Sequence, residues 1–296
     1  MRARPGVILS LAIAASSCSP QASSFTPSSM AQTSPANVPA PKAGGGFVIL
    51  HSFTGGMDGS EPNSAMVALN GDLYGTTKSG GGSTACSGGC GTVFGVSASG
   101  RERVVYRFQG GPGGSEPTAL LAYGDALYGV TEDGGKAARR GTVFHLTTSG
   151  ALTTVYRFHG DVRSGWDPQA LYAANGSLYG TTRSGGLNRN GVFFQITSSG
   201  NERVVRSFPR SQSQPRLLWL GGTFYGVRDD LGPGSPTGVI FTLDESGVES
   251  TLGYADVGAL GSFVGPPVTL NGDVYAASSG GGSLKCDPGA AVALVE

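Results

Sequence analysis

Short apolar segments alternate with Gly-, Ser- and Pro-rich stretches along most of the chain. Each segment is four to seven residues long and rich in Val, Phe, Tyr and Thr, whose side chains suit the pleated, half-buried surface of a β-strand. No segment shows a helical period of useful length. The pattern therefore predicts an all-β fold.

Four kinds of segment follow one another, and the set recurs about every 50 residues. In the copy of the repeat between Gly141 and Gly191, the first segment reads G-T-V-F, the second ends in an aromatic residue, the third is apolar and the fourth reads L-Y-G. The copies lie at 91–94, 141–144, 191–194, 238–241 and 290–294 (first), at 48–53, 104–108, 154–158, 204–208 and 250–254 (second), at 65–69, 119–123, 170–174, 216–220 and 267–270 (third), and at 73–77, 127–129, 178–180, 224–226 and 274–276 (fourth).

Four short strands at this period are typical of β-propeller blades, so the sequence predicts a five-bladed β-propeller of four-stranded antiparallel blades. The chain enters the pattern on a second segment, residues 47–53, and leaves it on a first segment, residues 290–296. These pieces complement each other. We therefore expect the N- and C-terminal strands to pair in one blade and close the ring, which removes open sheet edges.

Connection lengths predict which face of the propeller carries function. Turns from the third to the fourth segment, such as Asn175-Gly176, are two-residue hairpin turns, and those from the first to the second, such as Ser149-Gly150, are short as well. Antiparallel strands put both kinds on one face. The two long connections, one with an acid before proline and one rich in glycine, must lie on the opposite face, where we expect binding.

Charged and aromatic residues of this long-loop face are the candidate binding residues: Glu61, Glu116, Trp166, Asp167, Lys78, Glu132, Arg183, Arg228 and Asp229. The acids before proline could contact a ligand or a cation, or could fix their loops by accepting backbone N–H bonds. Their repetition in three blades favours the structural role, because a catalytic site breaks symmetry. Trp166 and the cations are of the types that stack on sugars or bind anions.

A catalytic constellation is not evident in the sequence. Paired carboxylates among Glu132, Asp229 and Asp230 could hydrolyse a glycoside, although solvated loop charge is the simpler interpretation. The three histidines lack metal-ligand spacing, no G-x-S-x-G elbow occurs, and the glycine clusters precede no helix that could bind phosphate. We expect no cofactor and no metal. A module that binds a glycan or a protein is the first hypothesis, and a polysaccharide hydrolase is the alternative.

Charge excludes one class of partner. Lys plus Arg number 20 and Asp plus Glu number 20 in 296 residues, and the pI is near 6.8. A nucleic-acid-binding domain normally needs a basic face. No nucleic-acid partner is expected.

The N-terminal segment predicts export. Residues 1–18 begin with Arg2 and Arg4, continue with an apolar core and end in small residues at Cys18. This end resembles the lipobox of bacterial lipoproteins, in which the cysteine is lipidated. Ser19 resembles outer-membrane sorting, so an outer-membrane or periplasm-facing lipoprotein, held by its lipid anchor alone, is expected; an ordinary secreted protein is the alternative. Residues 19–46, rich in Ser, Pro and Ala, predict a disordered tether before the propeller at 47–296.

Three cysteines remain in the predicted mature domain, and an oxidising compartment favours disulfides. Cys86 and Cys90 flank a short, glycine-flexible loop that can close on itself. Cys286 occupies the place of Cys86 in the last repeat, so a bridge to Cys286 is the rival pairing. Three thiols without a nearby histidine argue against a zinc site.

The repeat as a whole resembles a known family. G-T-V-F, a Ser-Gly turn, an aromatic-ending strand, an acid-Pro loop and L-Y-G-T-T resemble the GloVer tandem repeat of bacterial exported proteins described as choice-of-anchor, over residues 47–296 and most strongly in the first three repeats. The resemblance implies surface anchoring and carries over no catalytic residues. More loosely, the chain resembles five-bladed lectins with one sugar pocket per blade.

Overall fold

The computed structural model describes residues 49–135, 140–160, 164–209, 215–230, 237–256, 263, 265–270, 273–277 and 292–295. The predicted signal segment with Cys18, the tether over 19–46 and Cys286 lie outside these residues. In the part of the chain that is described, no helix is long and apolar enough to cross a bilayer.

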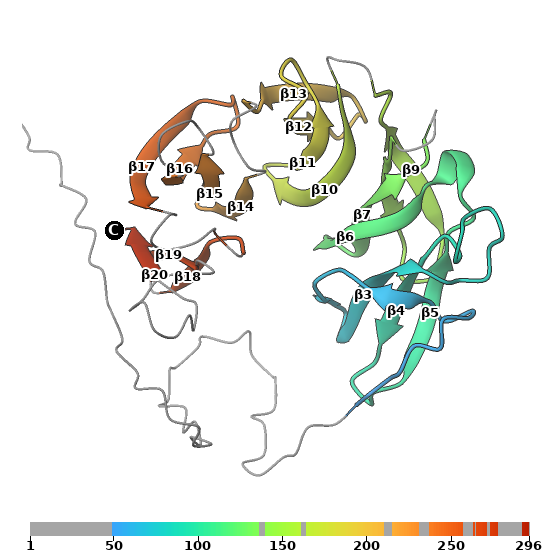
Figure 1. The fold of residues 1–296 in the computed structure, drawn as a ribbon. Helices are drawn as coiled ribbons and strands as arrows, with labels where there is room; N and C mark the ends of the chain where they lie inside the picture. The colour runs from blue at the N-terminus through green and yellow to red at the C-terminus, as the bar shows by residue number, and fades with distance from the viewer. Residues whose placement is uncertain are drawn as a thin grey trace, which may run out of the picture.

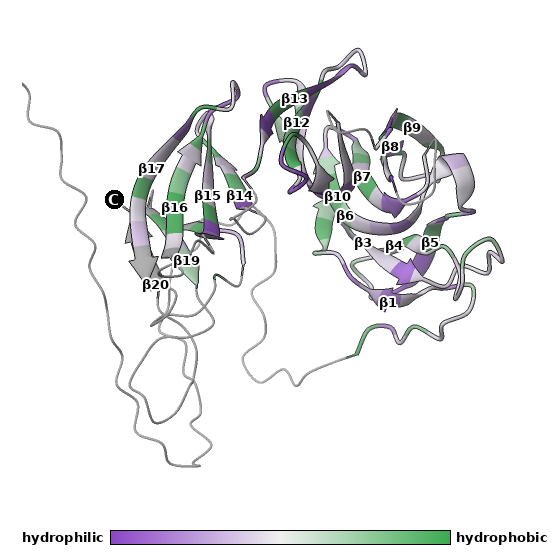
Figure 2. Ribbon diagram, turned by 45° about the horizontal axis from the view of Figure 1, so that its top comes forward, coloured by the Kyte–Doolittle hydropathy of each residue, from purple (hydrophilic) through white to green (hydrophobic). Residues whose placement is uncertain are grey.

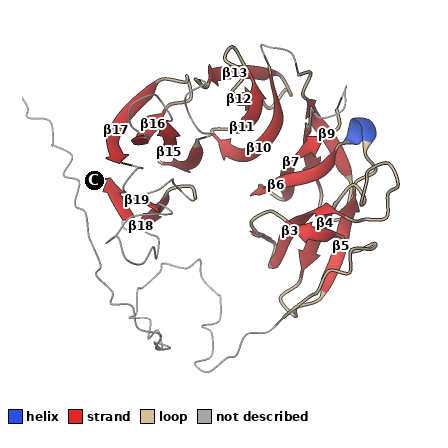
Figure 3. Cartoon of the chain, viewed as in Figure 1, coloured by secondary structure: helices blue, strands red, loops and turns tan. Residues whose placement is uncertain are grey.

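The all-β class is confirmed. The strands of the described residues form five antiparallel sheets arranged around a common centre (Figure 1), and Figure 3 shows one 3-10 turn, η1 (Gly111–Gly113), beside them. Sheet 1 contains β1 (Ser60–Pro62), β2 (Val67–Leu69), β3 (Asp72–Ser79), β4 (Thr92–Val96) and β5 (Glu102–Arg107); sheet 2 contains β6 (Ser115–Tyr123), β7 (Ala126–Asp133), β8 (Thr142–Leu146) and β9 (Leu152–Arg157); sheet 3 contains β10 (Gly165–Ala174), β11 (Ser177–Gly185), β12 (Val192–Ile196) and β13 (Glu202–Ser207); sheet 4 contains β14 (Arg216–Leu220), β15 (Thr223–Asp230), β16 (Thr237–Leu243) and β17 (Glu249–Asp256); and sheet 5 contains β18 (Val268–Leu270), β19 (Asp273–Ala277) and β20 (Val292–Val295).

Strands follow chain order within each sheet. The third segment of the repeat gives the inner strands β6, β10 and β14, which face the centre in Figure 1, and the second segment gives the outer strands β9, β13 and β17. In sheet 1 the inner position is shared by β1 and β2, which both pair with β3. The acid-Pro loop therefore connects one sheet to the next, while the glycine-rich loop stays within a sheet.

The L-Y-G glycine has a packing role in each of the first four sheets. A Cβ atom on Gly129 would lie 2.3 Å from Cζ of Phe144 and 2.8 Å from the carbonyl oxygen of Ala119. The register between β8 and β9 shifts at Val143/Phe144, which is the mark of a β-bulge. Only glycine leaves room for the phenylalanine of G-T-V-F to lie across the neighbouring strand, so the two motifs of the repeat depend on each other.

Hydrophobic cores lie between successive sheets rather than in one central cluster. Phe108, at the end of sheet 1, packs edge-on against Phe144 of sheet 2 with ring centroids 5.3 Å apart, and Phe158 packs against Phe194 in the same way at 5.2 Å. Figure 2 shows the hydrophobic stretches that build these cores within strands such as β16. Burial of the aromatic segment ends thus joins each sheet to the next.

The predicted closure is not confirmed. Residues 49–53 form no strand, because a strand requires a hydrogen-bonded neighbour and none is described for this segment. Sheet 5 accordingly has three strands in the described residues. The segment nevertheless packs on sheet 1. The ring of Phe53 lies 4.8 Å from that of Phe94, which repeats the ring contact that joins sheet 1 to sheet 2 and sheet 2 to sheet 3.

Candidate functional site

The alternation of short and long connections places six of the predicted residues at one end of the inner strands of sheets 1 to 3. We call this set the charged rim: Glu61, Lys78, Glu116, Glu132, Asp167 and Arg183. The acids lie near the starts of β1, β6 and β10, while Lys78, Glu132 and Arg183 hold the same register position near the ends of β3, β7 and β11. The rim lies on the long-loop face, as the connection lengths predict.

The acids before proline are held by the backbone of the preceding sheet. The Glu116 N–H donates to the carbonyl of Cys90 at 2.9 Å, and the Asp167 N–H donates to that of Arg140 at 3.1 Å. A Cβ on Gly141 would meet Cδ of Pro168 at 2.5 Å, so the glycine of G-T-V-F seats the proline. The repeat therefore sets each acid at the boundary between two sheets.

All three acids adopt a left-handed backbone conformation, with φ of 57° at Glu61, 56° at Glu116 and 60° at Asp167. Glycine adopts this conformation without strain, whereas an L-residue with a side chain does so at a cost of about 1–2 kcal/mol. A side chain retained in a strained position in three successive repeats indicates that its carboxylate has a role.

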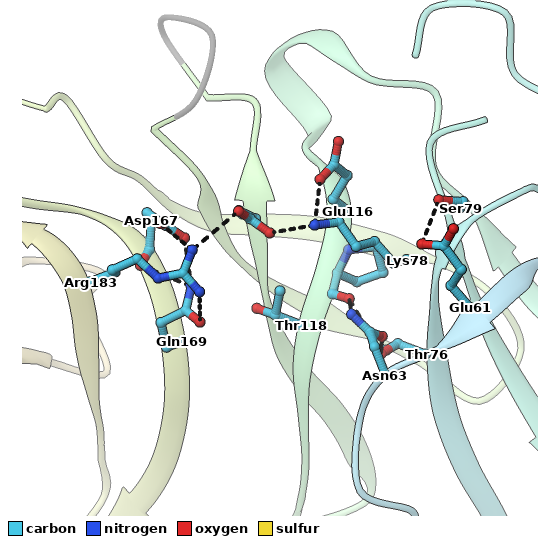
Figure 4. Close-up of polar contacts among 12 residues, drawn as sticks. Glu61, Asn63, Thr76, Lys78, Ser79, Glu116, Thr118, Asp167, Gln169 and Arg183 are labelled. Atoms are coloured by element: carbon cyan, nitrogen blue, oxygen red, sulfur yellow. Dashed lines mark hydrogen bonds and ion pairs between the residues drawn. The ribbon is translucent and has the colours of Figure 1, made fainter. Parts of the chain in front are cut away.

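An ion-pair network connects the sheets across the rim (Figure 4). The Lys78 Nζ lies 3.2 Å from Glu116 Oε2 and 3.1 Å from Glu132 Oε2, so it joins sheet 1 to sheet 2. The Arg183 Nη1 lies 3.6 Å from Glu132 Oε1 and 3.3 Å from Asp167 Oδ2, so it joins sheet 2 to sheet 3. The sequence suggested that the acids before proline fix their loops by accepting backbone N–H bonds. In the structure, the carboxylates of Glu116 and Asp167 form ion pairs with the side chains of Lys78 and Arg183.

A second layer of neutral hydrogen bonds lies beneath the ions. The residue after each proline donates to the proline carbonyl of the next sheet: Asn63 Nδ2 to Pro117 at 2.9 Å, and Thr118 Oγ1 to Pro168 at 3.2 Å. Gln169 departs from this pattern. It donates to the Asp167 carboxylate and accepts from Arg183 Nη2 at 3.1 Å, so the rim is not symmetric at sheet 3.

The rim is partly exposed and formally acidic. Two cations and four carboxylates give a net charge of 2 − 4 = −2 when all are ionised. Burial, the largest cause, raises the pKa of Asp167 from 3.8 to about 6, although nearby Arg183 opposes this shift. The hydrogen bond from Lys78 to Glu132 raises the pKa of Lys78. Arg183 is the most exposed of the five ion-paired members, at 56% of its side-chain surface, and is well placed to meet a ligand.

The loops next to the rim hold two further predicted features. The predicted disulfide Cys86–Cys90 is confirmed, and it closes the glycine-rich loop whose Cys90 carbonyl holds Glu116. Trp166 is half-buried, with the guanidinium of Arg140 4.8 Å from its ring centroid. The indole ring is therefore already engaged on the side that faces Arg140.

Arg228 and Asp229 are not part of the rim, because sheet 4 buries them. Arg228 is 5% exposed, lies 3.0 Å from Glu249 and stacks over Phe241 at 4.7 Å. Asp229, 6% exposed, accepts a hydrogen bond from the Phe263 N–H at 3.3 Å. Their environment is that of packing residues, which the sequence alone did not indicate.

Gln169, Asn63 and Thr118 are rim contacts that reasoning from the sequence missed. The signal was their shared position directly after the recurring proline. No group of three or more His, Cys, Asp or Glu side chains is placed to hold a metal ion within the described ranges. The arrangement offers donors and acceptors together at one surface, which suits a polar, hydroxyl-rich ligand.

Solved structures with similar backbones match this chain at low sequence identity. An oligogalacturonate lyase in complex with manganese matches at 16% identity and a TM-score of 0.45, over 75% of this chain and 59% of its own. An α-L-arabinofuranosidase from Clostridium thermocellum matches at 14% and 0.43, over 73% and 81%, and a protein named YjhT at 13% and 0.48, over 73% and 72%. This chain thus spans about three fifths of the lyase.

A comparison with curated proteins found no match. A family model, described as the Gloeobacter/Verrucomicrobia repeat, matches residues 38–227, which include the three sheets of the charged rim. This confirms the resemblance carried by the repeat motifs. The chain belongs to the Gloeobacter/Verrucomicrobia repeat family.

Proposed function

We propose that the protein is a binding module that takes a glycan at the charged rim. The observation that supports this most directly is the ion-pair network itself, in which five side chains from three sheets meet at one partly exposed surface, two of them, Glu116 and Asp167, on strained backbone. Its alternating donors and acceptors match the hydroxyl groups of a sugar, and the acidic balance disfavours a polyanion. A surface protein with a polar, cationic epitope is the other partner that this chemistry suits.

We propose further that the five sheets are the blades of a closed propeller, with the segment over 47–53 adding the fourth strand beside β20. Phe53 supports this, because its contact with Phe94 repeats the contacts of Phe108 with Phe144 and of Phe158 with Phe194, which join sheet 1 to sheet 2 and sheet 2 to sheet 3. Closure would place the rim around the mouth of the ring.

We also propose that the domain is exported and held at the cell envelope by a lipid on Cys18. The basic start, short apolar core and small-residue end of residues 1–18 support this, as does the tether after them, which carries almost no charge. Incorporation of labelled palmitate that is lost in Cys18→Ser would support anchoring, and release of unlabelled protein into the medium would contradict it.

A polysaccharide hydrolase remains the second candidate, and one observation favours it. Asp167, with its pKa raised to about 6 by burial, lies on the same network as Glu116 and Glu132, and a glycosidase requires one protonated and one ionised carboxyl. Release of reducing ends from a polysaccharide, abolished in Asp167→Asn, would favour the enzyme over the binding module.

The binding proposal is tested with the full chain on a glycan array and in a pull-down from envelope proteins. Arg183→Ala removes the most exposed donor of the rim and is expected to weaken binding about tenfold or more, since hydrogen bonds to charged groups contribute about 1.5–3 kcal/mol. Arg101→Ala is the matched control, because Arg101 is an exposed arginine on the turn face. Equal losses in both variants, or no ligand in either screen, would contradict the proposal.

A further inference from the structure

A hollow of about 400 Å³ lies between sheets 2 and 3 on the face of short turns, opposite the charged rim. Its lining includes Tyr123, Tyr128, His145, Thr153, Thr197 and Ser198. Thr197 and Ser198 belong to the turn between β12 and β13, while the two tyrosines, His145 and Thr153 come from sheet 2. The hollow thus spans the boundary between two sheets, and its volume is in the range of small-molecule sites, about 300–1,000 Å³.

The two neighbouring boundaries carry an arginine where this one carries Thr153. Arg103 pairs with Gly95, Thr153 with His145 and Arg203 with Gln195, so the three occupy one register position. Arg103 donates from Nη1 to the Thr148 carbonyl of sheet 2 at 3.2 Å, and Arg203 donates from Nη2 to the Glu245 carbonyl of sheet 4 at 3.2 Å. Each arginine spans its boundary and fills it, whereas the short threonine cannot.

Two further exchanges at the same boundary supply aromatic rings. Tyr123 stands where sheets 1 and 3 have Leu69 and Ala174, as the strand pairings show. His145 stands where the same sheets have Gly95 and Gln195.

The rings form a continuous wall. The Tyr128 centroid lies 5.1 Å from that of His145 and 6.2 Å from that of Tyr123, and Tyr123 is 42% exposed. Three coordinated departures from the repeat therefore open and line a single space.

The chemistry of the lining selects the ligand. Among its eleven residues none is Asp, Glu, Lys or Arg, so no counter-charge is provided for an ion. Tyrosine and histidine rings offer flat apolar surface, and the hydroxyls of Thr153, Thr197 and Ser198 offer donors and acceptors at its edge. A sugar ring presents C–H groups on its face and hydroxyls around its rim.

We propose that this hollow is a second binding site, separate from the charged rim, and that it takes an uncharged pyranose. The site exists because sheet 2 has Thr153 at the position where the neighbouring sheets have an arginine that spans the boundary. Sheet 2 also has aromatic rings, Tyr123 and His145, at two positions where those sheets have none. It operates whether or not the charged rim binds a glycan, because the two lie on opposite faces.

The test uses saturation-transfer NMR on the full chain with the methyl glycosides of glucose, galactose, mannose and xylose, followed by titration of any that bind. At least one is expected to show transfer, with the strongest signal on the C–H face that stacks on tyrosine. Thr153→Arg restores the arginine of the neighbouring sheets and fills the hollow. It is expected to abolish the signal while leaving the unfolding temperature unchanged or higher.

Tyr123→Ala is the second variant, since an exposed ring is removed without disturbing the core, and it is expected to weaken binding about tenfold. Arg101→Ala, at an exposed turn of sheet 1 that lies outside the lining of the hollow, is the matched control and should bind the same glycoside unchanged. A signal that survives in both hollow variants would come from another surface, such as the rim, and not from the hollow. Absence of transfer for all four glycosides overturns the proposal, as does undiminished binding to folded Thr153→Arg.

Discussion

The charged rim of sheets 1 to 3 and a cluster in sheet 4, formed by Arg228, Asp229 and Glu249, occupy corresponding positions of the repeat but use their charges differently. At the position directly before the rim residue Glu132, sheet 2 has Thr131, whose hydroxyl lies 2.9 Å from that of Thr142. Sheet 4 has Arg228 there, opposite Val239, and the guanidinium turns to Glu249 within its own sheet. The rim pairs its charges between sheets where water reaches them, while sheet 4 pairs its charges inside one sheet and out of water.

The next position makes the same contrast. Lys78, Glu132 and Arg183 form ion pairs with one another at the surface, but Asp229 accepts a hydrogen bond from the backbone N–H of Phe263. One scaffold position thus serves as a surface contact in three sheets and as an attachment for a connecting segment in the fourth. A repeat preserves the place of a side chain, and the neighbouring loop decides its use.

Glu249→Ala should have the largest effect, because it removes the carboxylate shared by Arg228 at 3.0 Å and Arg206 at 3.2 Å. Removing one partner of a buried pair leaves an uncompensated charge and costs about 3–5 kcal/mol. Urea unfolding of the variant measures this loss. Asp72→Ala is the control, since its pair with Arg103 is partly exposed and should cost less than about 1 kcal/mol. Equal losses in the free energy of unfolding for the two variants would mean that the carboxylate of Glu249 is as hydrated as that of Asp72.

The strands, their order and the face of the long loops could be predicted from sequence, because each rests on local chemistry that recurs. L-Y-G and G-T-V-F recur because a glycine makes room for a phenylalanine, and Asn-Gly marks its turn wherever it occurs. The pairing of Cys86 with Cys90 was predictable for the same reason, since the loop between them is short. The strand expected at 47–53 was not found at 49–53, because its pairing depends on a distant partner.

The candidate site could be predicted only in part. Six of the nine predicted binding residues meet at the rim, since position in the repeat determined where they lie. Arg228 and Asp229 do not, because burial depends on Glu249 and Phe263, which lie in less regular stretches of the sequence. The hollow beside Thr153 was missed because it arises from a departure from the repeat, and the search followed what the repeats share.

Asp167→Asn should have an intermediate effect that depends on pH. The folded-state pKa of Asp167, about 6, exceeds the ordinary value of 3.8, so the folded protein binds this proton more tightly than the unfolded chain does. The associated stability is fully present below about pH 4 and is lost as pH rises through about 6. At a partly hydrated rim the difference should amount to about 1–2 kcal/mol.

Urea unfolding between pH 4 and pH 7 measures that dependence, which Asp167→Asn should remove. Asp125→Asn, an exposed acid in a turn of the opposite face, serves as the control and should keep the wild-type profile. A wild-type profile retained by Asp167→Asn would show that Asp167 is as hydrated as a surface acid, and would withdraw support from the hydrolase.

Lys78→Met should have the smallest effect on stability, although Lys78 joins two sheets. Its side chain is 37% exposed, and an exposed pair contributes about 0.2–1 kcal/mol, since the charges are hydrated and screened. A double-mutant cycle with Glu132→Gln isolates the pair, and its coupling should vanish at about 1 M salt, where the screening length falls to about 3 Å. The coupling of Arg228 with Glu249 should persist at that salt concentration, because these side chains are only 6% and 13% exposed. If the Lys78 coupling also persisted, the rim would be a dry structural junction like the cluster of sheet 4, and no ligand would have to be invoked to explain its charges.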